Sequence, residues 1–198
     1  NYAEEVIHGI NFTFNGGPKT ATNRNRVVEK AMGNCHYLLM IDTDMTFEKE
    51  TLETMIQTAE AHPGAIITGI ATLGFPPFRP AIFTCDFEPD EKPQHIERWP
   101  DEPFQIDACG SFGILIPHPA LEKLGLGCFT HIYDYYEADD PEDRELRHDL
   151  AFSKRAKDAG IPIICNPAVE FGHLRLYPAG VSDWKQNRDF KPPKPLDV

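Results

Sequence analysis

The feature that most constrains this chain is a short apolar run that ends in two acids. Residues 37–41 are apolar, and Asp42 and Asp44 follow at once. The run is too short for an ordinary helix and is typical of a buried, parallel central strand. Ligands bind at the carboxyl ends of strands in an open α/β sheet, and two acids there can share a divalent cation that also holds phosphate oxygens. Asp42 and Asp44 are therefore the first candidate site residues.

The same acids also have a purely structural interpretation. Asp42-Thr43-Asp44 can be the exit of a strand, with Thr46 as the N-cap of a helix from about residue 47 to residue 61. These residues taken alone leave both interpretations open.

Strands and helices alternate around this segment. We expect helices at residues 20–32, 47–61, 118–124 and 147–159. We expect strands at residues 5–14, 65–71, 81–85, 161–165 and 168–171, two strand pieces within 105–117, a turn at 166–167 and an exposed excursion at 88–103. This order favours a parallel sheet with right-handed crossovers, and so an α/β fold.

Composition narrows the class of protein. The 198 residues suit a single domain, which we place at residues 1–190 with a proline-rich tail at 191–198. The net charge of -12 argues against a nucleic-acid-binding surface. Five scattered cysteines without a CxxC pair indicate reduced thiols and a cytoplasmic protein. No apolar run reaches the roughly 18 residues of a membrane helix, and we see no signal peptide.

Two further features admit both a functional and a structural account. Arg24 and Arg26 lie at the start of a predicted helix, where they can meet a diphosphate or simply face solvent. Gly110 and Gly113 permit close approach of the backbone to a ligand, but a bulge or tight bend explains them equally well.

Taken together, these pieces resemble a glycosyltransferase of the GT-A fold, in the family 2-like branch that includes phage and bacterial proteins. The resemblance covers roughly residues 12–175 and implies a Rossmann-like fold with a mostly parallel central sheet, flanking helices and a small antiparallel portion. It rests on Arg24-Asn25, the D-x-D motif Asp42-Thr43-Asp44, the segment 107–113, the helix and strand between His148-Asp149 and Asn166-Pro167, and Gly172-His173.

The resemblance implies a donor site for a nucleoside-diphosphate sugar, UDP- or GDP-linked. By it, Asp44 is a direct ligand of Mn²⁺ or Mg²⁺, Asp42 contacts the nucleotide or the metal, and His173 is a further metal ligand. An ordinary histidine at a strand end is the alternative for His173. The resemblance also places four more residues at the nucleotide sugar: Arg24, Asn25, Asp107 and Gly110.

The resemblance assigns the acceptor side to Asp149. In inverting members an acid at this place is the general base for the acceptor hydroxyl of a glycan or another molecule. The family usually has Glu-Asp here, whereas this chain has His148-Asp149. The alternative is that Asp149 only caps its helix or complements its dipole.

Some readings stay open. Only about twenty residues precede Arg24, fewer than the first strand and base-binding loop of such domains need, so the chain is a fragment, has a different base site or has lost activity. A haloacid dehalogenase-like phosphatase, with Asp42 as nucleophile and Asp44 as acid/base, is a second enzyme hypothesis. A domain that binds a nucleotide or glycan without turnover is the non-enzymatic one.

Overall fold

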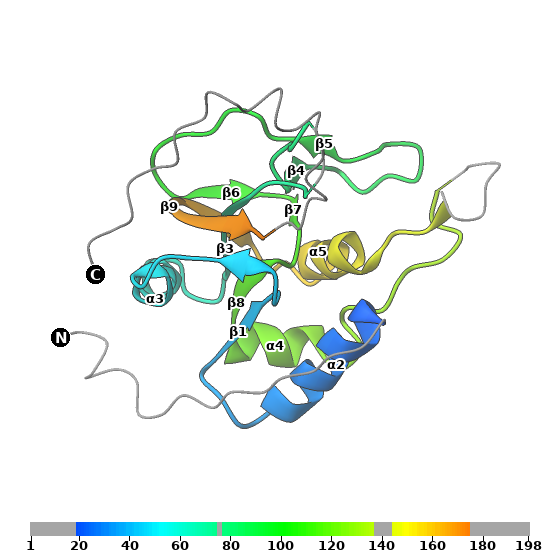
Figure 1. Cartoon of the computed structure of the whole chain (residues 1–198). Helices are drawn as coiled ribbons and strands as arrows, with labels where there is room; N and C mark the ends of the chain where they lie inside the picture. Colours follow the sequence, from blue (N-terminus) through cyan, green and yellow to red (C-terminus); the bar gives the residue numbers. More distant parts are fainter. Residues whose placement is uncertain (1–18, 75–76, 137–143, 175–198) are drawn as a thin grey trace, which may run out of the picture.

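The computed structural model describes residues 19–74, 77–136 and 144–174 (Figure 1). Its helices are α2 (Thr20–Ala31), α3 (Thr51–Ala61), α4 (His118–Leu124) and α5 (His148–Asp158). Its strands are β1 (Tyr37–Ile41), β2 (Met45–Thr46), β3 (Ile66–Ala71), β4 (Ile82–Thr84), β5 (Gln94–His95), β6 (Phe104–Ile106), β7 (Ala108–Cys109), β8 (Gly113–Pro117) and β9 (Ile163–His173). The strand expected at 5–14 and the tail at 191–198 lie outside the described residues.

The main sheet is mixed. Its order is β1-β8-β3-β9-β2, with β6 also beside β9. Strands β3 and β9 pair in parallel, and the other pairings described in this sheet are antiparallel. Strands β1, β3 and β9 still run in one direction, because β8 lies antiparallel between β1 and β3. The α/β class is confirmed. The expected mostly parallel pairing is wrong, because β8 fills the place beside β1 that a parallel neighbour would take.

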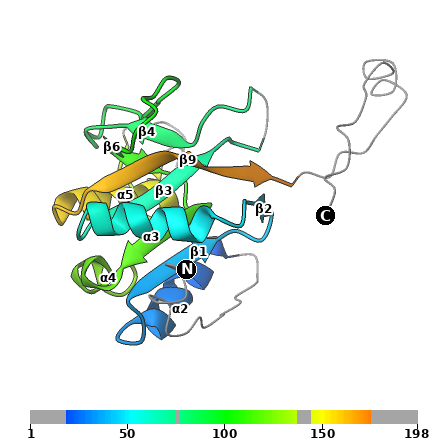
Figure 2. The ribbon, with the colours of Figure 1, turned by 90° about the vertical axis from the view of Figure 1, so that its left-hand side faces the viewer.

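Alternating residues of the central strands face two different helical layers. Figures 1 and 2 show α3 on one side of the sheet and α2 with α4 on the other. The layer that includes α2, α4 and α5 contributes Val28, Leu121 and Phe152 to a core with Ile66, Ile114 and Ile163. The layer of α3 contributes Met55 and Ile56 to a core with Ile67, Leu115 and Ile164. Both faces of the sheet are therefore covered, and the strand ends are where polar groups gather.

Helix α3 begins later than predicted. It starts at Thr51, with Glu50 at the N-cap position and no capping side chain. The predicted cap Thr46 lies instead in β2, where it pairs with Gly172. The prediction of a helix from residue 47 was wrong because Met45 and Thr46 are held in a strand by the end of β9, and the chain enters its helix only at Thr51.

Strand β9 is one long strand rather than two strands with a turn. The predicted turn at 166–167 lies inside it, and the register against β3 shifts between Thr68 and Ile70. Gly69 sits at this irregularity, and a Cβ there would overlap Val169. The glycine thus allows β9 to pass close to β3 and continue to His173.

The remaining elements lie beside the main sheet. Strands β5, β4 and β7 form a small antiparallel sheet, so the predicted excursion at 88–103 contains one paired strand. All five cysteines are free thiols, and all except Cys35 are buried. No helix in the described parts of the chain has the length and apolar character to cross a membrane.

Candidate active site

Arg24 joins helix α2 to the end of β1. Its Nη2 donates to both carboxylate oxygens of Asp42, at 2.8 and 3.1 Å, and its Nη1 donates to the backbone oxygen of Ser111 at 2.8 Å. The Asp42 amide donates to the carbonyl oxygen of Phe112 at 2.9 Å, which fixes the chain as it leaves the strand. Arg24 is only 7 % exposed. The arginine of the predicted Arg-Asn pair is therefore a buried partner of the first acid of the D-x-D motif.

Ser111 carries this connection on to Asp149. The Ser111 hydroxyl donates to Oδ1 of Asp149, and Nε2 of His148 lies 3.0 Å from the same oxygen. Asp149 is in the first turn of α5, where the helix dipole favours a carboxylate. The N-cap position belongs to Arg147, so Asp149 does not cap the helix. The site thus brings together the end of β1, the segment before β8 and the start of α5.

The carboxylates of this site affect one another. Burial raises the pKa of Asp42, the negative charges of Asp149 and Asp44 raise it further, and Arg24 opposes these effects. Burial also acts to raise the pKa of Asp149, but His148, Arg24 and Ser111 outweigh it and hold that pKa below its ordinary value. We call Arg24, Asp42, Asp44, Ser111 and Asp149 the acid site. It gathers three carboxylates, and a bound cation would relieve the repulsion between them.

Asp44 and His173 come together through strand pairing. Met45 lies opposite His173 in the ladder between β2 and β9, and the Leu174 amide donates to the backbone oxygen of Asp44 at 2.7 Å. Nδ1 of His173 is buried and has no hydrogen-bond partner among the described residues. In those same residues, no group of three or more His, Cys, Asp or Glu side chains is arranged to hold a metal ion. The backbone thus places the predicted metal residues at one end of the sheet.

Asn25 and Gly110 have structural partners. Asn25 donates to the Thr130 hydroxyl at 3.1 Å and accepts from the Phe129 amide at 2.9 Å, so it ties α2 to the segment after α4. The Gly110 amide donates to the carbonyl oxygen of Ala81 at 2.8 Å. Gly110 immediately precedes Ser111 in the chain and so borders the acid site, whereas the contacts of Asn25 belong to packing.

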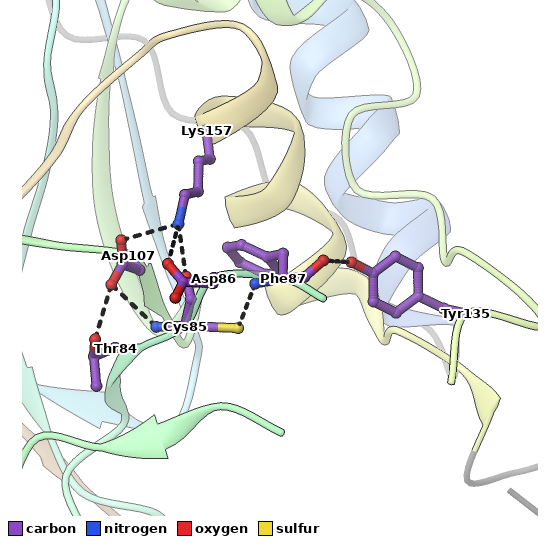
Figure 3. Close-up of polar contacts among 7 residues, drawn as sticks. All are labelled: Thr84, Cys85, Asp86, Phe87, Asp107, Tyr135 and Lys157. Atoms are coloured by element: carbon purple, nitrogen blue, oxygen red, sulfur yellow. Dashed lines mark hydrogen bonds and ion pairs between the residues drawn. The ribbon is translucent and has the colours of Figure 1, made fainter. Parts of the chain in front are cut away.

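Asp107 belongs to a different polar group, drawn in Figure 3. Its Oδ2 accepts from the Thr84 hydroxyl and from the Cys85 amide, both at 3.0 Å. Lys157 donates to the Cys85 carbonyl at 2.8 Å and lies 3.4 Å from Asp107 and 3.5 Å from Asp86. We call these five residues the lysine cluster. The lysine cluster connects the end of β4 to the last turn of α5. The contacts of Asp107 in the structure belong to this connection.

Sequence reasoning did not single out three residues near Asp149. Ser111 lies inside the segment 107–113. Its place between Gly110 and Gly113 was the sequence feature that could have marked it as a site residue. The ring of His131 stacks on His148, with centroids 5.7 Å apart and planes at 19°. Nδ1 of His131 lies 3.2 Å from Glu145. No signal in the sequence links His131 to His148 across the intervening residues.

Comparison with known proteins gives the family. The sequence model described as glycosyl transferase family 2 matches residues 2–124, a range that includes Arg24, Asp42 and Asp44 and ends before Asp149 and His173. A search of curated protein sequences finds no significant match.

Two solved structures have a similar fold. The crystal structure of A197 from STIV has a TM-score of 0.54 and 15% sequence identity, over 80% of this chain and 69% of that chain. The crystal structure of GalNAc-T7 with UDP, GalNAc and Mn²⁺ has a TM-score of 0.54 and 11% identity, over 80% of this chain and 31% of that chain. This chain therefore spans less than a third of the GalNAc-T7 chain. At such identities the likeness shows the fold alone.

The family match favours one of the two enzyme hypotheses left open above. The match covers more than half of the chain and includes the apolar strand that ends in Asp42 and Asp44. The phosphatase hypothesis rested on the same strand and gave its two acids other roles. With the mixed α/β sheet of the GT-A fold, this protein belongs to glycosyl transferase family 2.

Proposed function

We propose that this glycosyltransferase moves a sugar from a UDP- or GDP-linked donor to a hydroxyl of a glycan or another acceptor, with inversion at the transferred carbon. One observation carries the proposal. Arg24 links Asp42 at the end of β1 to Ser111, and Ser111 links to Asp149 at the start of α5. The candidate donor acid and the candidate base thus meet in one site although they are far apart in the sequence.

The donor half of the site suits a divalent cation, Mn²⁺ or Mg²⁺. Burial raises the pKa of Asp42, and the charges of Asp149 and Asp44 raise it further, an effect that a bound cation would oppose. His173, whose Nδ1 has no hydrogen-bond partner among the described residues, lies on the strand beside Asp44. A mixed carboxylate and imidazole set suits Mn²⁺ well, and the GalNAc-T7 structure holds UDP and Mn²⁺. The described side chains of Asp42, Asp44 and His173 are not already grouped around one point, so these three residues would have to close on the cation to hold it. The bound cation would neutralise a diphosphate leaving group.

The acceptor half depends on Asp149. Both hydrogen bonds that the described residues make to its carboxylate go to Oδ1, which leaves Oδ2 to take a proton. Its lowered pKa keeps it ionised at neutral pH, as a base must be. In the proposed step the acceptor oxygen bonds to the sugar carbon, the bond from that carbon to the diphosphate breaks, and the hydroxyl proton goes to Oδ2 of Asp149.

Calorimetric titration tests the donor site first. UDP, GDP and their sugar conjugates are titrated with and without Mn²⁺ into the wild type, Asp44→Ala and a control, Asp90→Asn, whose acid is exposed. We expect metal-dependent binding in the wild type and the control and none in Asp44→Ala. Equal binding in Asp44→Ala would refute the donor site.

Turnover separates the proposal from its non-enzymatic alternative. The nucleotide that binds names the donors to assay, and release of nucleoside diphosphate from each sugar conjugate is followed with and without acceptors. Donor binding with neither transfer nor hydrolysis would favour a binding domain over an enzyme. Transfer that survives Asp149→Asn at the wild-type rate would remove Asp149 from its role.

A further inference from the structure

The acceptor half of the site contains a group of residues that the proposed function does not use. Glu145, His131, His148 and Asp149 form a continuous chain of contacts that ends at the base. We propose that His148 is a positioning residue for Asp149, held in place by His131 and Glu145. The proposal rests on the proposed function, since it concerns the base of that reaction.

The contact between His148 and Asp149 fixes one carboxylate oxygen. Nε2 of His148 lies 3.0 Å from Oδ1, and the Ser111 hydroxyl donates to the same oxygen. A carboxylate held from one side by two donors cannot rotate freely about its terminal torsion, so its other oxygen is presented in a constant direction. Small losses of such orientation cost reaction rate even when binding is unchanged.

His148 is itself held by a second imidazole. The rings of His131 and His148 are 5.7 Å apart and nearly parallel, and Glu145 lies 3.2 Å from Nδ1 of His131. The ring of Tyr133 also lies beside His131, with the two ring centroids 6.0 Å apart. The side chains of His131, Glu145 and His148 are all partly buried, which limits their alternative rotamers.

Backbone pairing brings these two histidines together. Ile132 and Leu146 form an antiparallel bridge, with amide-to-carbonyl distances of 3.0 and 2.9 Å. The bridge places His131 next to one member of the pair and Glu145 next to the other. His148 follows two residues after Leu146, as the first residue of α5. The stacked pair is therefore a product of the fold rather than of two mobile surface side chains.

The chemistry of His148 differs from that of the acid usual in the family. A glutamate at this position would place a second negative charge beside the base, whereas an imidazole places a hydrogen-bond donor there. Burial acts to raise the pKa of Asp149, and the hydrogen bond and charge of His148 are the largest of the effects that together lower that pKa. The substitution thus converts a neighbour that would repel the ionised base into one that supports it.

The geometry requires a particular protonation of His148. Its Nε2 must carry the hydrogen, because the carboxylate oxygen at 3.0 Å is an acceptor only. A neutral His148 is therefore expected as the Nε2–H tautomer. This requirement supplies a test that needs neither donor nor acceptor.

The first experiment measures tautomers in the intact chain. Long-range ¹H–¹⁵N correlation spectra of histidine-labelled wild type and Asp149→Asn are recorded near neutral pH, with His148→Gln used to assign the His148 ring. We expect an Nε2-bound hydrogen on His148 in the wild type and a weakened preference in Asp149→Asn. A neutral Nδ1–H tautomer in the wild type would overturn the proposal.

The second experiment measures turnover with the donor found by titration. We compare His148→Ala and His148→Gln with His36→Gln, a change at an exposed histidine between α2 and β1. His148→Ala should lower kcat by about tenfold or more and change the donor KM by less than about twofold, because orientation rather than binding is lost. His148→Gln, whose amide nitrogen can donate from the same place, should recover most of the lost rate.

The outcomes separate this proposal from the proposed function. If His148→Ala remains folded and keeps the wild-type kcat, His148 does not position the base, although the transferase proposal stands. If His148→Ala fails to fold, His148→Gln at wild-type rate supports the proposal and His148→Gln as slow as Asp149→Asn contradicts it. If the wild type turns over no donor, the proposed function fails, and the tautomer measurement alone decides whether His148 holds Asp149.

Discussion

Helix α5 carries a polar group at each end, and the two groups differ in one respect. The acid site meets its first turn through Asp149, and the lysine cluster meets its last turn through Lys157. Both charges have the sign that the helix dipole favours at that end. At the last turn, Lys157 has two carboxylates and a carbonyl around it, and Asp107 has donors on both oxygens. At the first turn, the carboxylates of the acid site act on one another, and the charges of Asp149 and Asp44 add to the effect of burial in raising the pKa of Asp42.

The comparison shows how a structural polar group can be told from a functional one. In the lysine cluster an ammonium lies between the two carboxylates, so these charges are held together by attraction. The acid site keeps like charges together, an arrangement that costs stability unless a ligand or ion completes it. Residue type alone does not distinguish them, since each contains acids and a base.

Asp149→Asn should have the largest effect on the rate of sugar transfer. An unchanged rate would show that the acid site and the lysine cluster do not differ in function. We expect transfer to fall by about 10²- to 10⁴-fold, the usual contribution of a general base, while donor affinity changes little. Initial rates and calorimetry on the same preparation measure the two. Lys157→Met, at the other end of the helix, is the matched control and should keep its turnover once its fold is verified.

Asp44→Ala should weaken metal-dependent donor binding strongly. The loss should equal or exceed the roughly 10- to 100-fold that removal of a partner of a metal ligand costs. Titration of the nucleotide with and without Mn²⁺ gives the affinity. Binding of the same strength in the absence of metal would show that the excess of carboxylates serves another purpose.

Arg24→Met should destabilise the fold. It removes the partner of Asp42 and a donor to Ser111, so the free energy of unfolding should fall by about 2 to 3 kcal/mol. This is at or below the lower limit of the roughly 3 to 5 kcal/mol for a broken buried pair, because Asp42 keeps some access to water. Urea denaturation measures the change. Arg26→Met, an exposed change on the same helix, should stay within about 0.5 kcal/mol of the wild type.

Asp107→Asn tests whether the lysine cluster serves stability rather than donor binding. It weakens the contacts with Lys157 and the Cys85 amide, and we expect a loss of about 1 kcal/mol in the free energy of unfolding with donor binding unchanged. Thermal unfolding and nucleotide titration are the two measurements. A selective loss of binding at wild-type stability would instead restore the sequence-based prediction that Asp107 contacts the nucleotide sugar.

The smallest effects concern pH, and they have opposite signs at the two ends of α5. The pKa of Asp149 is lowered in the folded chain, so its stabilising contribution is present above its unfolded pKa of about 3.9 and is lost as the pH falls through the folded value. Burial opposes the charge on Lys157, but Asp107 and Asp86 leave its pKa raised. Its contribution is complete below about pH 10.4 and is lost as the pH rises through the folded value.

Stability measured across pH checks these signs. The difference in free energy of unfolding between wild type and Asp149→Asn should shrink toward acid pH. The difference between wild type and Lys157→Met should shrink toward alkaline pH. A common direction for both would show that the two groups are not electrostatically distinct.

Much of the fold could be predicted because its signals are local. The apolar run of β1, the glycine that follows α5 and the proline at the start of α4 each act within a few residues, and these elements lie where the sequence placed them. Thr46 was misplaced because a capping residue and an edge-strand residue look alike until the partner strand is known. The antiparallel direction of β8 was also not predicted, because it depends on pairing with β1 and β3, which are distant in the sequence.

The site could be predicted only as separate pieces. Family resemblance named Arg24, Asp42 and Asp149, and the structure connects them through Ser111. The roles of Asp44, His173 and Asp149 stay predictions until binding and turnover are measured. The stacked histidines depend on the bridge between Ile132 and Leu146, a pairing for which the sequence contains no local pattern.

The length of β9 has a consequence for how the site assembles. The same strand pairs with β6 near its start and with β3 along most of its length, and it sets Met45 opposite His173 at its end. A slip of one residue along this strand would exchange its two faces and bring Gly172 or Leu174 to the place of His173. Metal-dependent nucleotide binding would then report strand register, and its return on refolding would mark the moment at which the last strand has found its proper alignment.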